Sequence, residues 1–432
     1  MLETSVAVVG WILFGGLALL LVLRVPLGFA LAVSTAVAYV YTGDSFVSLA
    51  QSFYDSVDSF PLVAVPMFFL AGSVMETGGI SRRLVAVAEA TIGSIRGGLG
   101  MVAILASMFF SAISGSGPAT TAAVGGIMVP AMLCRNYPAA LSGAIVATGG
   151  TLGVLIPPSI LLILYGVLAD VSISKLFLGA MLPGLFIGFF LMFVVYLLCR
   201  VLGVQGTEER FDLKRLLRTI WSAKLSLLVP VIILGGIYAG IFTATESAVV
   251  AVFYGVFVSM FIYRELSFAQ LKKVVLSSAK VTGKLGILWG VSVAYGEVMT
   301  MYKLPTILSE HMLGFTSSPV LILFIISLFL IFTGCFMNSI SQVILFTPIY
   351  LPVIKAAGID PIHFAMVFVI NAEIGFLTPP LGTNLFVAME QSGVTLGAIS
   401  KAVIPFIISL FVATAIIILV PQLTLWLPGL LM

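Results

Sequence analysis

Apolar segments of membrane-spanning length, roughly 20 residues, dominate this chain and restrict it to one class of fold. Of its 432 residues, 61% are apolar and only 9% are charged. A soluble domain of this size could not cover its core with so few polar side chains. Helices satisfy their own backbone hydrogen bonds inside a bilayer. We therefore expect an all-α polytopic membrane protein.

Twelve segments are predicted to enter the membrane, and they fall into three kinds. Two consist of paired apolar halves around a polar tip, residues 98–133 and 319–354, and are predicted to be re-entrant helical hairpins. Two are long and contain internal prolines, residues 139–169 and 361–391, and are predicted to be broken helices. The rest are single spans. The single spans are residues 5–23, 26–42, 62–77, 173–203, 225–242, 245–264, 285–302 and 403–430.

The basic residues predict the orientation of the chain, because cytoplasmic loops are enriched in Lys and Arg. Suppose that the N-terminus lies outside the cytoplasm and that each hairpin enters and leaves on one side. Of the 20 Lys and Arg, only Lys175, Lys303 and Lys355 then fall outside the cytoplasmic positions. A hairpin that crossed fully would move every later loop to the other side. The first hairpin therefore opens to the cytoplasm and the second to the opposite side.

Two charged segments are predicted to be helices that lie on the cytoplasmic surface of the membrane. Residues 81–96, SRRLVAVAEATIGSIR, and residues 208–224, EERFDLKRLLRTIWSAK, mix charged and apolar residues at helical spacing. Amphipathic helices of this kind lie in the plane of the interface. Ordinary soluble loops are the alternative interpretation.

The hairpins and broken helices recur with an offset of 222 residues, which predicts an internal repeat. Because the two units enter from opposite sides, they are inverted relative to each other. Inverted repeats with broken helices are a recurring architecture of secondary transporters, whose sites lie near the bilayer midplane between the repeats. The aligned residues are Ser116 and Asn338, Pro130 and Pro352, Gly153 and Gly375, and the pairs Pro157-Pro158 and Pro379-Pro380.

The polar tips and proline breaks predict a site for ions. At residues 114–118, SGSGP, a helix must end and reverse, so its terminal backbone groups lose their helical partners. Such groups cost several kcal/mol in hydrocarbon, so they must line a polar cavity or lie inside protein. The proline pairs free carbonyls one turn back in the same way. Freed carbonyls and side-chain oxygens suit a hard cation such as Na⁺, and helix N-termini attract anions.

We therefore expect the tips and breaks to hold Na⁺ and an anionic substrate group. The predicted sodium ligands are Ser114, Gly115, Ser116, Thr148, Gly150, Thr151, Gly153, Met337, Asn338, Ser341, Asn371, Gly375 and Thr378. The predicted substrate contacts are Ser116, Gly117, Pro157, Asn338, Ser339, Pro379, Thr383 and Asn384.

Three acidic residues within apolar segments have different predicted roles. Glu246 follows Thr243 by three residues, which is typical of a capping box, and we favour that structural role over ion coupling. Glu297 is expected to have a structural partner within a scaffold span. Glu373 precedes TPP, and acids at bilayer depth are functional candidates. It could stay protonated, form a pair or approach a cation site.

Other classes of function are disfavoured by the residues present. The net charge of +3 is small and no basic run with aromatics occurs, so nucleic acid is not an expected partner. Three cysteines without CxxC spacing and only two histidines disfavour a Cys/His metal site and a disulfide framework. The sequence contains no GxxxxGK[ST] loop, so ATP is not the expected energy source. It also contains no convincing nucleophile–base constellation, so an enzyme is not expected.

Four stretches of the chain resemble the large membrane subunit of tripartite ATP-independent periplasmic (TRAP) transporters, and the resemblance covers nearly the whole chain in order. It implies a sodium-coupled elevator-type importer of a small organic acid, such as a sialic acid or a C4-dicarboxylate. One departure is Asn338, which stands where an acidic residue is often expected. The stretches are SGSGPATTAAVGGIMVPAML, TLGVLIPPSILLILYGVLADVSISKLFLGAMLPG, GGIYAGIFTATESAVVAVFYGVFVSMFIYRELS and NAEIGFLTPPLGTNLFVA.

The resemblance also implies partners, location and domains. A small four-helix membrane (Q) subunit would brace the scaffold, and a periplasmic substrate-binding (P) protein would deliver the substrate. The location would be the bacterial inner membrane, with the N-terminus periplasmic. The expected domains are N-terminal scaffold helices with an interfacial helix at 1–97, transport-domain repeat 1 at 98–170, scaffold or arm helices at 171–318, repeat 2 at 319–392, and a C-terminal helix at 393–432.

The sequence leaves alternatives to this importer open. A stand-alone secondary anion transporter without a binding protein is one, and a channel or non-transporting membrane scaffold is another. A channel would not need paired broken helices that open on opposite sides. An intramembrane enzyme would need His, Asp or Cys converging at depth, and the apolar segments do not supply them.

Overall fold

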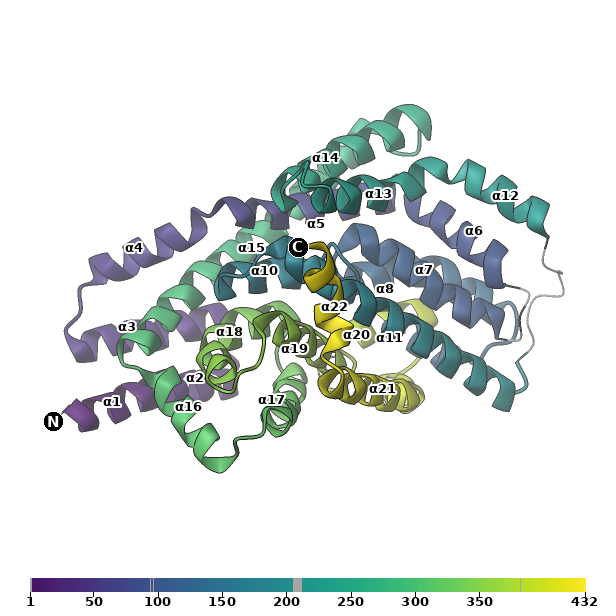
Figure 1. The fold of residues 1–432 in the computed structure, drawn as a ribbon. Coiled ribbons are helices and arrows are strands. Elements are labelled where there is room, and N and C mark those ends of the chain that lie inside the picture. The colour runs from purple at the N-terminus through teal and green to yellow at the C-terminus, as the bar shows by residue number, and fades with distance from the viewer. Residues whose placement is uncertain (1, 94, 96, 205–211, 381) are drawn as a thin grey trace.

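The computed structural model describes residues 2–93, 95, 97–204, 212–380 and 382–432, and within these ranges every regular element is a helix (Figure 1). Seven helices in this part of the chain are long and apolar enough to cross a membrane, or up to nine if two bent pairs each count as one span. The predicted all-α membrane fold is confirmed. Arg96 and Arg210, which belong to the two predicted interfacial segments, lie outside the described residues.

Six of the eight predicted single spans are helices within a few residues of their predicted bounds. They are α1, η1 and α2 (Leu2–Gly10, Trp11–Gly15 and Gly16–Val22), α3 (Leu27–Thr42), η2 and α5 (Phe60–Val63 and Ala64–Thr77), α11 (Ile173–Val201), α13 (Lys224–Tyr238), and α14 with η3 (Ala244–Phe257 and Val258–Ile262).

The other two predicted spans differ from the structure. Residues 285–302 are only the second half of α15 (Phe268–Met301), which begins at a capping box formed by Ser267 and Gln270. The lysines of its first half are exposed, so they do not interrupt the helix. Residues 403–430 are two helices, α21 (Leu396–Leu419) and α22 (Gln422–Leu431), because Pro421 disfavours a helical conformation at the residue before it.

Two further helices were not predicted as elements. The first, α4 (Phe46–Val57), begins at Ser45, whose side chain accepts a hydrogen bond from the Val47 N–H. The second, α16 (Leu304–Phe315), joins α17 at a bend of 120°. Both are shorter than a membrane span and carry polar residues, so a search for long apolar runs does not find them.

The predicted hairpins and broken helices are confirmed, with the repeat visible in their bounds. The hairpins are α7 (Gly98–Ser114) with α8 (Gly117–Leu133) and α17 (Pro319–Gly334) with α18 (Ser339–Ala356). The broken helices are α9 (Ala139–Leu155) with α10 (Ile160–Ala169) and α19 (Pro361–Phe376) with α20 (Thr383–Ser392). Both α8 and α18, and likewise α9 and α19, begin 222 residues apart.

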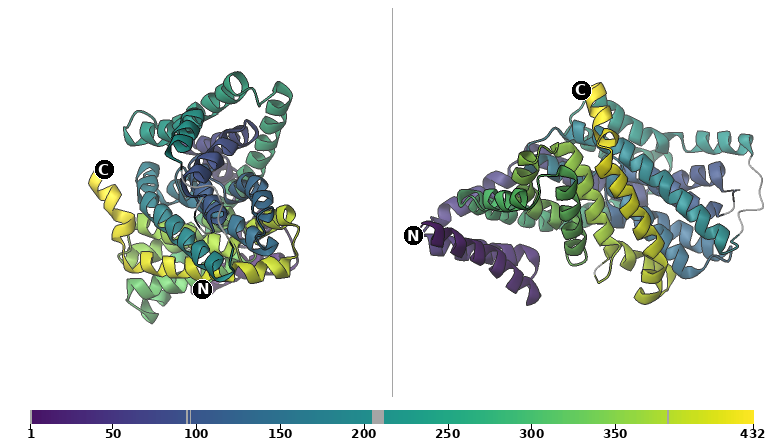
Figure 2. Two further views of the ribbon diagram at one scale, coloured as in Figure 1. Left: turned by 90° about the vertical axis from the view of Figure 1, so that its right-hand side faces the viewer. Right: turned by 60° about the horizontal axis from the view of Figure 1, so that its bottom comes forward.

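The two repeats pack directly against each other. Helices α20 and α21 of the second half of the chain contact α9, and α10 contacts both α18 and α19. Figure 2 shows the yellow and green helices of the second half side by side with the blue helices of the first. From Leu141 to Leu155 every residue of α9 is buried. Many of these residues are glycine, alanine or threonine, which are small enough for the neighbouring helices to approach closely.

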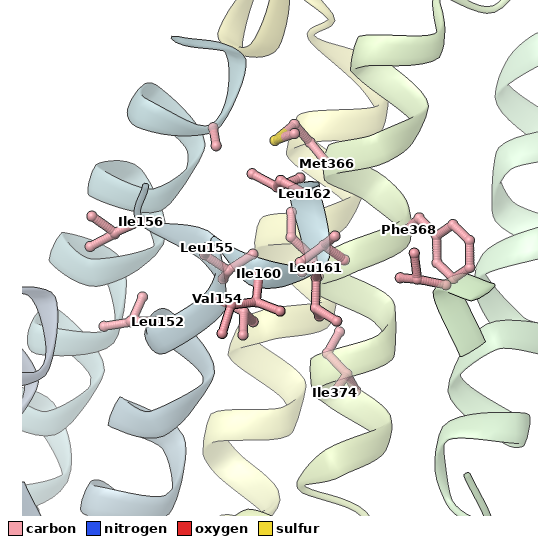
Figure 3. Close-up of a cluster of buried hydrophobic side chains, with 14 of the residues drawn as sticks. Leu152, Val154, Leu155, Ile156, Ile160, Leu161, Leu162, Met366, Phe368 and Ile374 are labelled. Carbon is pink, nitrogen blue, oxygen red and sulfur yellow. The ribbon is translucent and has the colours of Figure 1, made fainter. Parts of the chain in front are cut away.

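The break between α9 and α10 is held by apolar packing against α19. Leu155, Ile160 and Leu161 are at most 3% exposed and lie beside Met366 and Ile374 of α19 (Figure 3). Burying each such side chain contributes about 1.5–3 kcal/mol relative to exposure to water. This packing fixes the position of the interruption, so the polar groups at the break are presented from a rigid support.

The two predicted interfacial segments are helical, as expected. Helix α6 (Ile80–Ile92) and helix α12 (Leu213–Ser222) are in contact at one end of the molecule, and the N-terminus lies at the opposite end (Figure 1). On α12, Leu213, Leu217 and Trp221 recur every fourth residue and are all exposed. This spacing places them on one face of the helix. Their location at a membrane surface stays a prediction.

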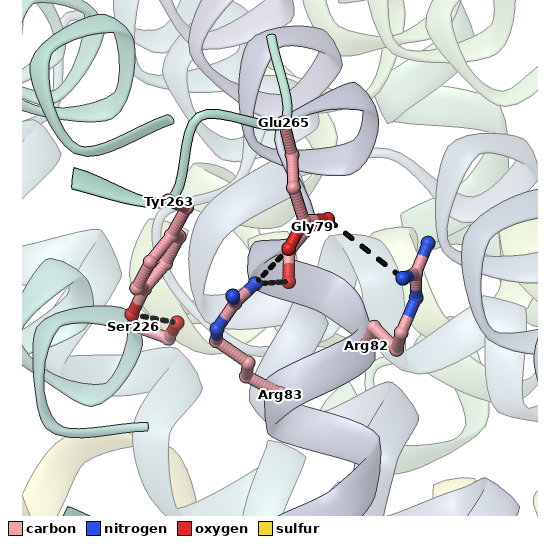
Figure 4. Close-up of polar contacts among 6 residues, drawn as sticks. All are labelled: Gly79, Arg82, Arg83, Ser226, Tyr263 and Glu265. Carbon is pink, nitrogen blue, oxygen red and sulfur yellow. Dashed lines mark hydrogen bonds and ion pairs between the residues drawn. The ribbon is translucent and has the colours of Figure 1, made fainter. Parts of the chain in front are cut away.

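A polar cluster ties α6 to the segment between η3 and α15 (Figure 4). The Arg83 guanidinium lies 2.8 Å from a carboxylate oxygen of Glu265 and donates a hydrogen bond of 2.9 Å to the Gly79 carbonyl. It also lies 3.5 Å from the centre of the Tyr263 ring, a cation–π contact. Tyr263 in turn is hydrogen-bonded to Ser226 of α13 at 3.1 Å. Arg83 therefore joins α6 to this segment, and Tyr263 joins the segment to α13.

Replacing Glu265 by glutamine should destabilise the protein, since it leaves the Arg83 charge without its carboxylate. We expect the free energy of unfolding to fall by about 1–2 kcal/mol, the range for a hydrogen bond to a charged group that is partly exposed. The measurement is thermal unfolding of the purified chain in detergent. Glu310→Gln, at an exposed position, is the control and should leave the transition unchanged. Equal transitions for both variants would show that the cluster adds no stability.

Candidate functional site

The first hairpin tip rests on the start of α10. Gly115 ends α7 with a φ of 61°, a left-handed conformation that favours glycine. Its carbonyl accepts a hydrogen bond of 3.4 Å from the Ile160 N–H. A Cβ atom placed on Gly115 would lie 2.9 Å from the Pro158 carbonyl oxygen. The tip of one element and the break of another are therefore joined through backbone atoms, without room for a side chain.

Hydroxyl groups surround this tip and satisfy its backbone. The Ser116 N–H donates to the Ser114 hydroxyl at 3.2 Å, and the Thr120 hydroxyl donates to the Ser116 carbonyl at 2.9 Å. The Ser114 and Thr120 hydroxyls lie 3.1 Å apart. Within a few ångströms the tip thus gathers the hydroxyl oxygens of Ser114 and Thr120 and the carbonyl oxygen of Ser116, the ligand type that Na⁺ uses.

The second tip is built from an amide cap. Asn338 precedes α18, and its Oδ1 accepts a hydrogen bond of 2.7 Å from the Ser341 N–H. The Gln342 amide donates to the Leu330 carbonyl at 3.0 Å and to the Thr333 hydroxyl at 3.1 Å, which closes the hairpin across its two arms. Asn338 is exposed, whereas Ser339 and Ser341 are buried.

Glycines at equivalent positions bring each hairpin against its broken helix. A Cβ atom on Gly153 of α9 would lie 2.5 Å from the Ser116 carbonyl oxygen. A Cβ atom on Gly375 of α19 would lie 2.5 Å from the Gly334 Cα. Gly153 and Gly375 are aligned at the offset of 222 residues. Both repeats thus use the same device, a helix glycine that admits the backbone of a hairpin.

The two hairpins converge on one carboxylate, that of Glu373. This side chain, on α19, is only 2% exposed. One of its oxygens accepts a hydrogen bond of 2.7 Å from the Ser339 hydroxyl at the start of α18. The other faces Gly117 at the start of α8, where a Cβ atom would lie 3.0 Å away. The tips therefore meet deep in the protein, as predicted from the sequence.

Further polar groups lie beside Gly117. The same hypothetical Cβ atom would lie 3.2 Å from the Gly150 carbonyl oxygen and 3.3 Å from the Asn384 amide nitrogen. Asn384 is fully buried, and its amide interacts with the Glu373 carboxylate. The Thr121 hydroxyl donates to the Gly117 carbonyl at 3.1 Å. Four helices, α8, α9, α19 and α20, contribute to this group of atoms.

The predicted site residues are only partly brought together. Ser114, Gly115, Ser116, Gly117, Gly150, Gly153, Ser339, Gly375 and Asn384 lie at the tips or where the repeats meet. Asn338 and Ser341 pair with each other, and Met337, Pro157, Pro379 and Thr383 lie at the second tip or at the breaks.

Four other predicted residues make their hydrogen bonds elsewhere. The hydroxyls of Thr148, Thr151 and Thr378 donate to carbonyls of their own helices at 2.7–2.9 Å. The Asn371 amide donates to Ser327 of α17 at 2.8 Å, away from the tips. These contacts are what a threonine or asparagine commonly makes inside a membrane helix.

Three residues of the site were not singled out in the sequence. They are Thr120, Thr121 and Gln342, and each lies four residues after a tip residue, at Ser116, Gly117 and Asn338 respectively. A residue four positions along a helix lies on the same face as the first. That spacing was the signal that could have identified them.

The two other acidic residues have structural partners. Thr243 and Glu246 form the predicted capping box. Glu297 of α15 accepts a hydrogen bond from Ser52 of α4. Among the described residues no three His, Cys, Asp or Glu side chains cluster as they would around a transition metal. The oxygen groups near the tips suit a hard cation instead.

Comparison with known proteins now identifies the family. A family model described as the DctM component of tripartite ATP-independent periplasmic transporters matches residues 14–423. The chain belongs to the DctM family. It is therefore a transporter subunit rather than an enzyme, as the sequence analysis expected.

Individual relatives match the DctM chain over almost its full length. It is 40% identical to the isethionate TRAP transporter permease protein DctMQ of Oleidesulfovibrio alaskensis, over 97% of this chain and 66% of that protein. It is 39% identical to the C4-dicarboxylate TRAP transporter large permease protein DctM of Pseudomonas aeruginosa, over 90% and 91%. It is 34% identical to the sialic acid TRAP transporter large permease protein SiaM of Vibrio cholerae, over 97% and 98%.

A solved structure shares the fold of this DctM chain. The crystal structure of the YdaH transporter of Alcanivorax borkumensis superposes with a TM-score of 0.64 and covers 89% of this chain and 88% of that one. The sequences are only 11% identical, so the likeness concerns the fold alone.

Replacing Gly153 by alanine should separate the first hairpin from α9, because the added Cβ atom meets a backbone oxygen that cannot move aside as a side chain would. We expect a loss of about 1–3 kcal/mol in unfolding free energy, the usual range for overpacking. Thermal unfolding in detergent measures it. Gly126→Ala in α8 is the matched control, since a Cβ atom there meets nothing within 4 Å. If both variants unfold at the same temperature, the close contact is not required.

Proposed function

We propose that this DctM-family chain is the membrane subunit of a sodium-coupled importer of a small organic anion. The observation that carries the proposal is the convergence of two hairpin tips and two helix breaks on one buried group of oxygens. In secondary transporters of inverted-repeat architecture such a position holds substrate and coupling ion. The names of the relatives, which include isethionate, C4-dicarboxylate and sialic acid, support the anion class.

Sodium fits the oxygens at the tips better than a transition metal or a nucleotide would. Ser114, Ser116 and Thr120 supply hydroxyl and carbonyl oxygens at the first tip. At the second tip the Asn338 side chain and the end of α17 offer amide and carbonyl oxygens. Helices α8 and α18 both begin at these tips, so their N-terminal ends favour an anionic substrate group nearby.

An elevator mechanism is proposed on the basis of the surface between the expected scaffold and transport domains. An apolar cavity of about 180 Å³ lies there. Val63, Leu285 and Trp289 line it from the scaffold, and Leu164 and Ile344 line it from the two repeats. An apolar boundary without directional bonds lets one body slide along the other at low energetic cost.

The proposed location is the bacterial inner membrane, with the N-terminus periplasmic. The basic helices α6 and α12 lie at the end of the molecule remote from the N-terminus, which supports this orientation (Figure 1). The proposed partners are a small membrane (Q) subunit and a periplasmic substrate-binding (P) protein. The DctMQ relative supports the first of these, since this chain spans only 66% of its length.

Uptake into proteoliposomes tests the proposal. The purified chain, reconstituted with its small subunit and binding protein, should accumulate a labelled organic anion under an inward Na⁺ gradient and not under an equal K⁺ gradient. Transport without the binding protein would favour a stand-alone anion transporter. Absence of uptake under all gradients would support a non-transporting scaffold, and passive flux without gradient coupling would support a channel.

Ser116→Ala should weaken the sodium dependence of uptake, because it removes a hydroxyl at the tip that is only partly buried. We expect the Na⁺ concentration for half-maximal uptake to rise by about three- to tenfold. This corresponds to the loss of one ligand that contributes about 0.5–1.5 kcal/mol. Ser107→Ala, which lies within α7 and away from the tip, is the control. Its hydroxyl donates to the Ala103 carbonyl at 2.8 Å and should change uptake less than about twofold. Equal effects would argue against a sodium site at the tip.

A further inference from the structure

Glu373 is not among the residues predicted to bind Na⁺ or substrate, yet it lies where the two hairpins meet. It lies between Gly117 and Ser339, the first residues of α8 and α18. These two residues are separated by 222 positions, so they are equivalents in the two repeats. The residue equivalent to Glu373 itself is Thr151, whose hydroxyl is used within its own helix. The two repeats thus share a single carboxylate at the point where they meet.

The Glu373 carboxylate has few hydrogen-bond donors around it. Oε1 accepts a hydrogen bond of 2.7 Å from Ser339, whereas Oε2 has only a weaker contact with the Asn384 amide. The described part of the chain also gives Glu373 no ion pair. A buried carboxylate without a cation or a full set of donors costs several kcal/mol, so such a group carries a proton or binds a positive charge.

The atoms next to Oε2 are those of a cation site. The Gly150 carbonyl oxygen and the Asn384 amide lie beside the same face of Gly117 as Oε2 does. The Asn384 side chain is fully buried, and a half-turn of its amide exchanges the nitrogen that lies beside the carboxylate for Oδ1, which has no hydrogen-bond partner among the described residues. The Thr121 hydroxyl and the Gly117 carbonyl add two further oxygens.

We propose that Glu373, Asn384 and the Gly150 carbonyl form a cation site shared by the two repeats, separate from the oxygens within each tip. Na⁺ is the expected ion, because the donors are all hard oxygens. The inference rests on the proposed sodium coupling and names the charged group behind it. Asn338 is neutral in this chain, so Glu373 supplies the negative charge at the junction of the hairpins.

The shared site makes cation binding depend on both repeats at once. Thr121 and Gly150 belong to the first repeat, and Glu373 and Asn384 belong to the second. An ion bound between them closes the contact of α8 and α9 with α19 and α20. Its occupancy therefore stabilises the assembled pair of repeats, by the linkage between ligand binding and folding.

Glu373→Gln tests the site because it keeps the shape of the side chain and removes its charge. The purified chain in detergent is heated in NaCl and in choline chloride at equal ionic strength. For the native protein we expect a rise in the unfolding temperature that saturates with Na⁺. In Glu373→Gln we expect the Na⁺ concentration for half of this rise to increase by at least about tenfold, since a charged ligand has become neutral.

Glu297→Gln is the matched control, another acid with a serine partner but far from the junction. It should respond to Na⁺ as the native protein does. A native protein without any Na⁺ response would overturn both this site and the proposed coupling. A native response that Glu373→Gln retains would overturn the shared site alone and leave sodium at the tips.

A second variant keeps the test decisive if Glu373→Gln does not fold. Asn384→Ala preserves the carboxylate and removes the amide ligand, and we expect at least a threefold loss of apparent Na⁺ affinity. An unchanged affinity in that variant overturns the site. Uptake in proteoliposomes adds a separate readout. If Glu373→Gln abolishes the pH dependence of uptake and leaves its Na⁺ dependence intact, the carboxyl group carries a proton and the cation site is wrong.

Discussion

The need to satisfy backbone polar groups away from water governs the rest of this structure. A chain with so few charged residues places helix ends inside apolar surroundings four times, at two tips and two breaks. Each end leaves N–H and C=O groups that hydrocarbon cannot satisfy. The hydroxyls of Ser114 and Thr120 serve the first tip, and the amides of Asn338 and Gln342 serve the second. The same interruptions create the oxygen-rich site.

Small residues make this arrangement possible at both ends of the repeat. Gly153 and Gly375 allow a hairpin backbone to approach a broken helix, and neither position tolerates a Cβ atom. The proline pairs then stop α9 and α19 a few residues later. The repeats agree in these backbone features and differ in their polar side chains. Thr151 and Glu373 occupy the same place in each unit, so only one repeat carries the charge.

The sequence predicts those parts of the fold that depend on local pattern. The bounds of α8, α9, α18 and α19 were found closely, because a fixed offset, glycines and prolines mark them twice. The predicted span begins at residue 285, whereas α15 begins at Phe268, because lysines interrupt the apolar pattern before residue 285 and the capping box at Ser267 carries no apolar signal. Helix α22 was missed because the apolar pattern runs through Pro421. Short polar helices such as α4 carry no spanning signal.

Tertiary contacts of the site could be predicted only in outline. The sequence places Asn371 and Glu373 two residues apart, so they point to different sides of α19, and only Glu373 reaches the tips. Composition cannot decide which of the two does so. The hydrogen bond between Ser339 and Glu373 joins residues 34 positions apart. It exists because α18 and α19 pack against each other, which no local pattern records.

A single carboxylate between two related hairpins has a physical consequence for transport. A negative charge there is stabilised by the N-terminal ends of α8 and α18, which approach it from both repeats. The same helix ends would otherwise attract the anionic substrate. At the proposed cation site, Glu373 would compete with an anionic substrate for these ends until a cation neutralises it. Cation binding would then free the helix ends for the anion, so the two solutes would bind in a linked way through contacts that both repeats provide.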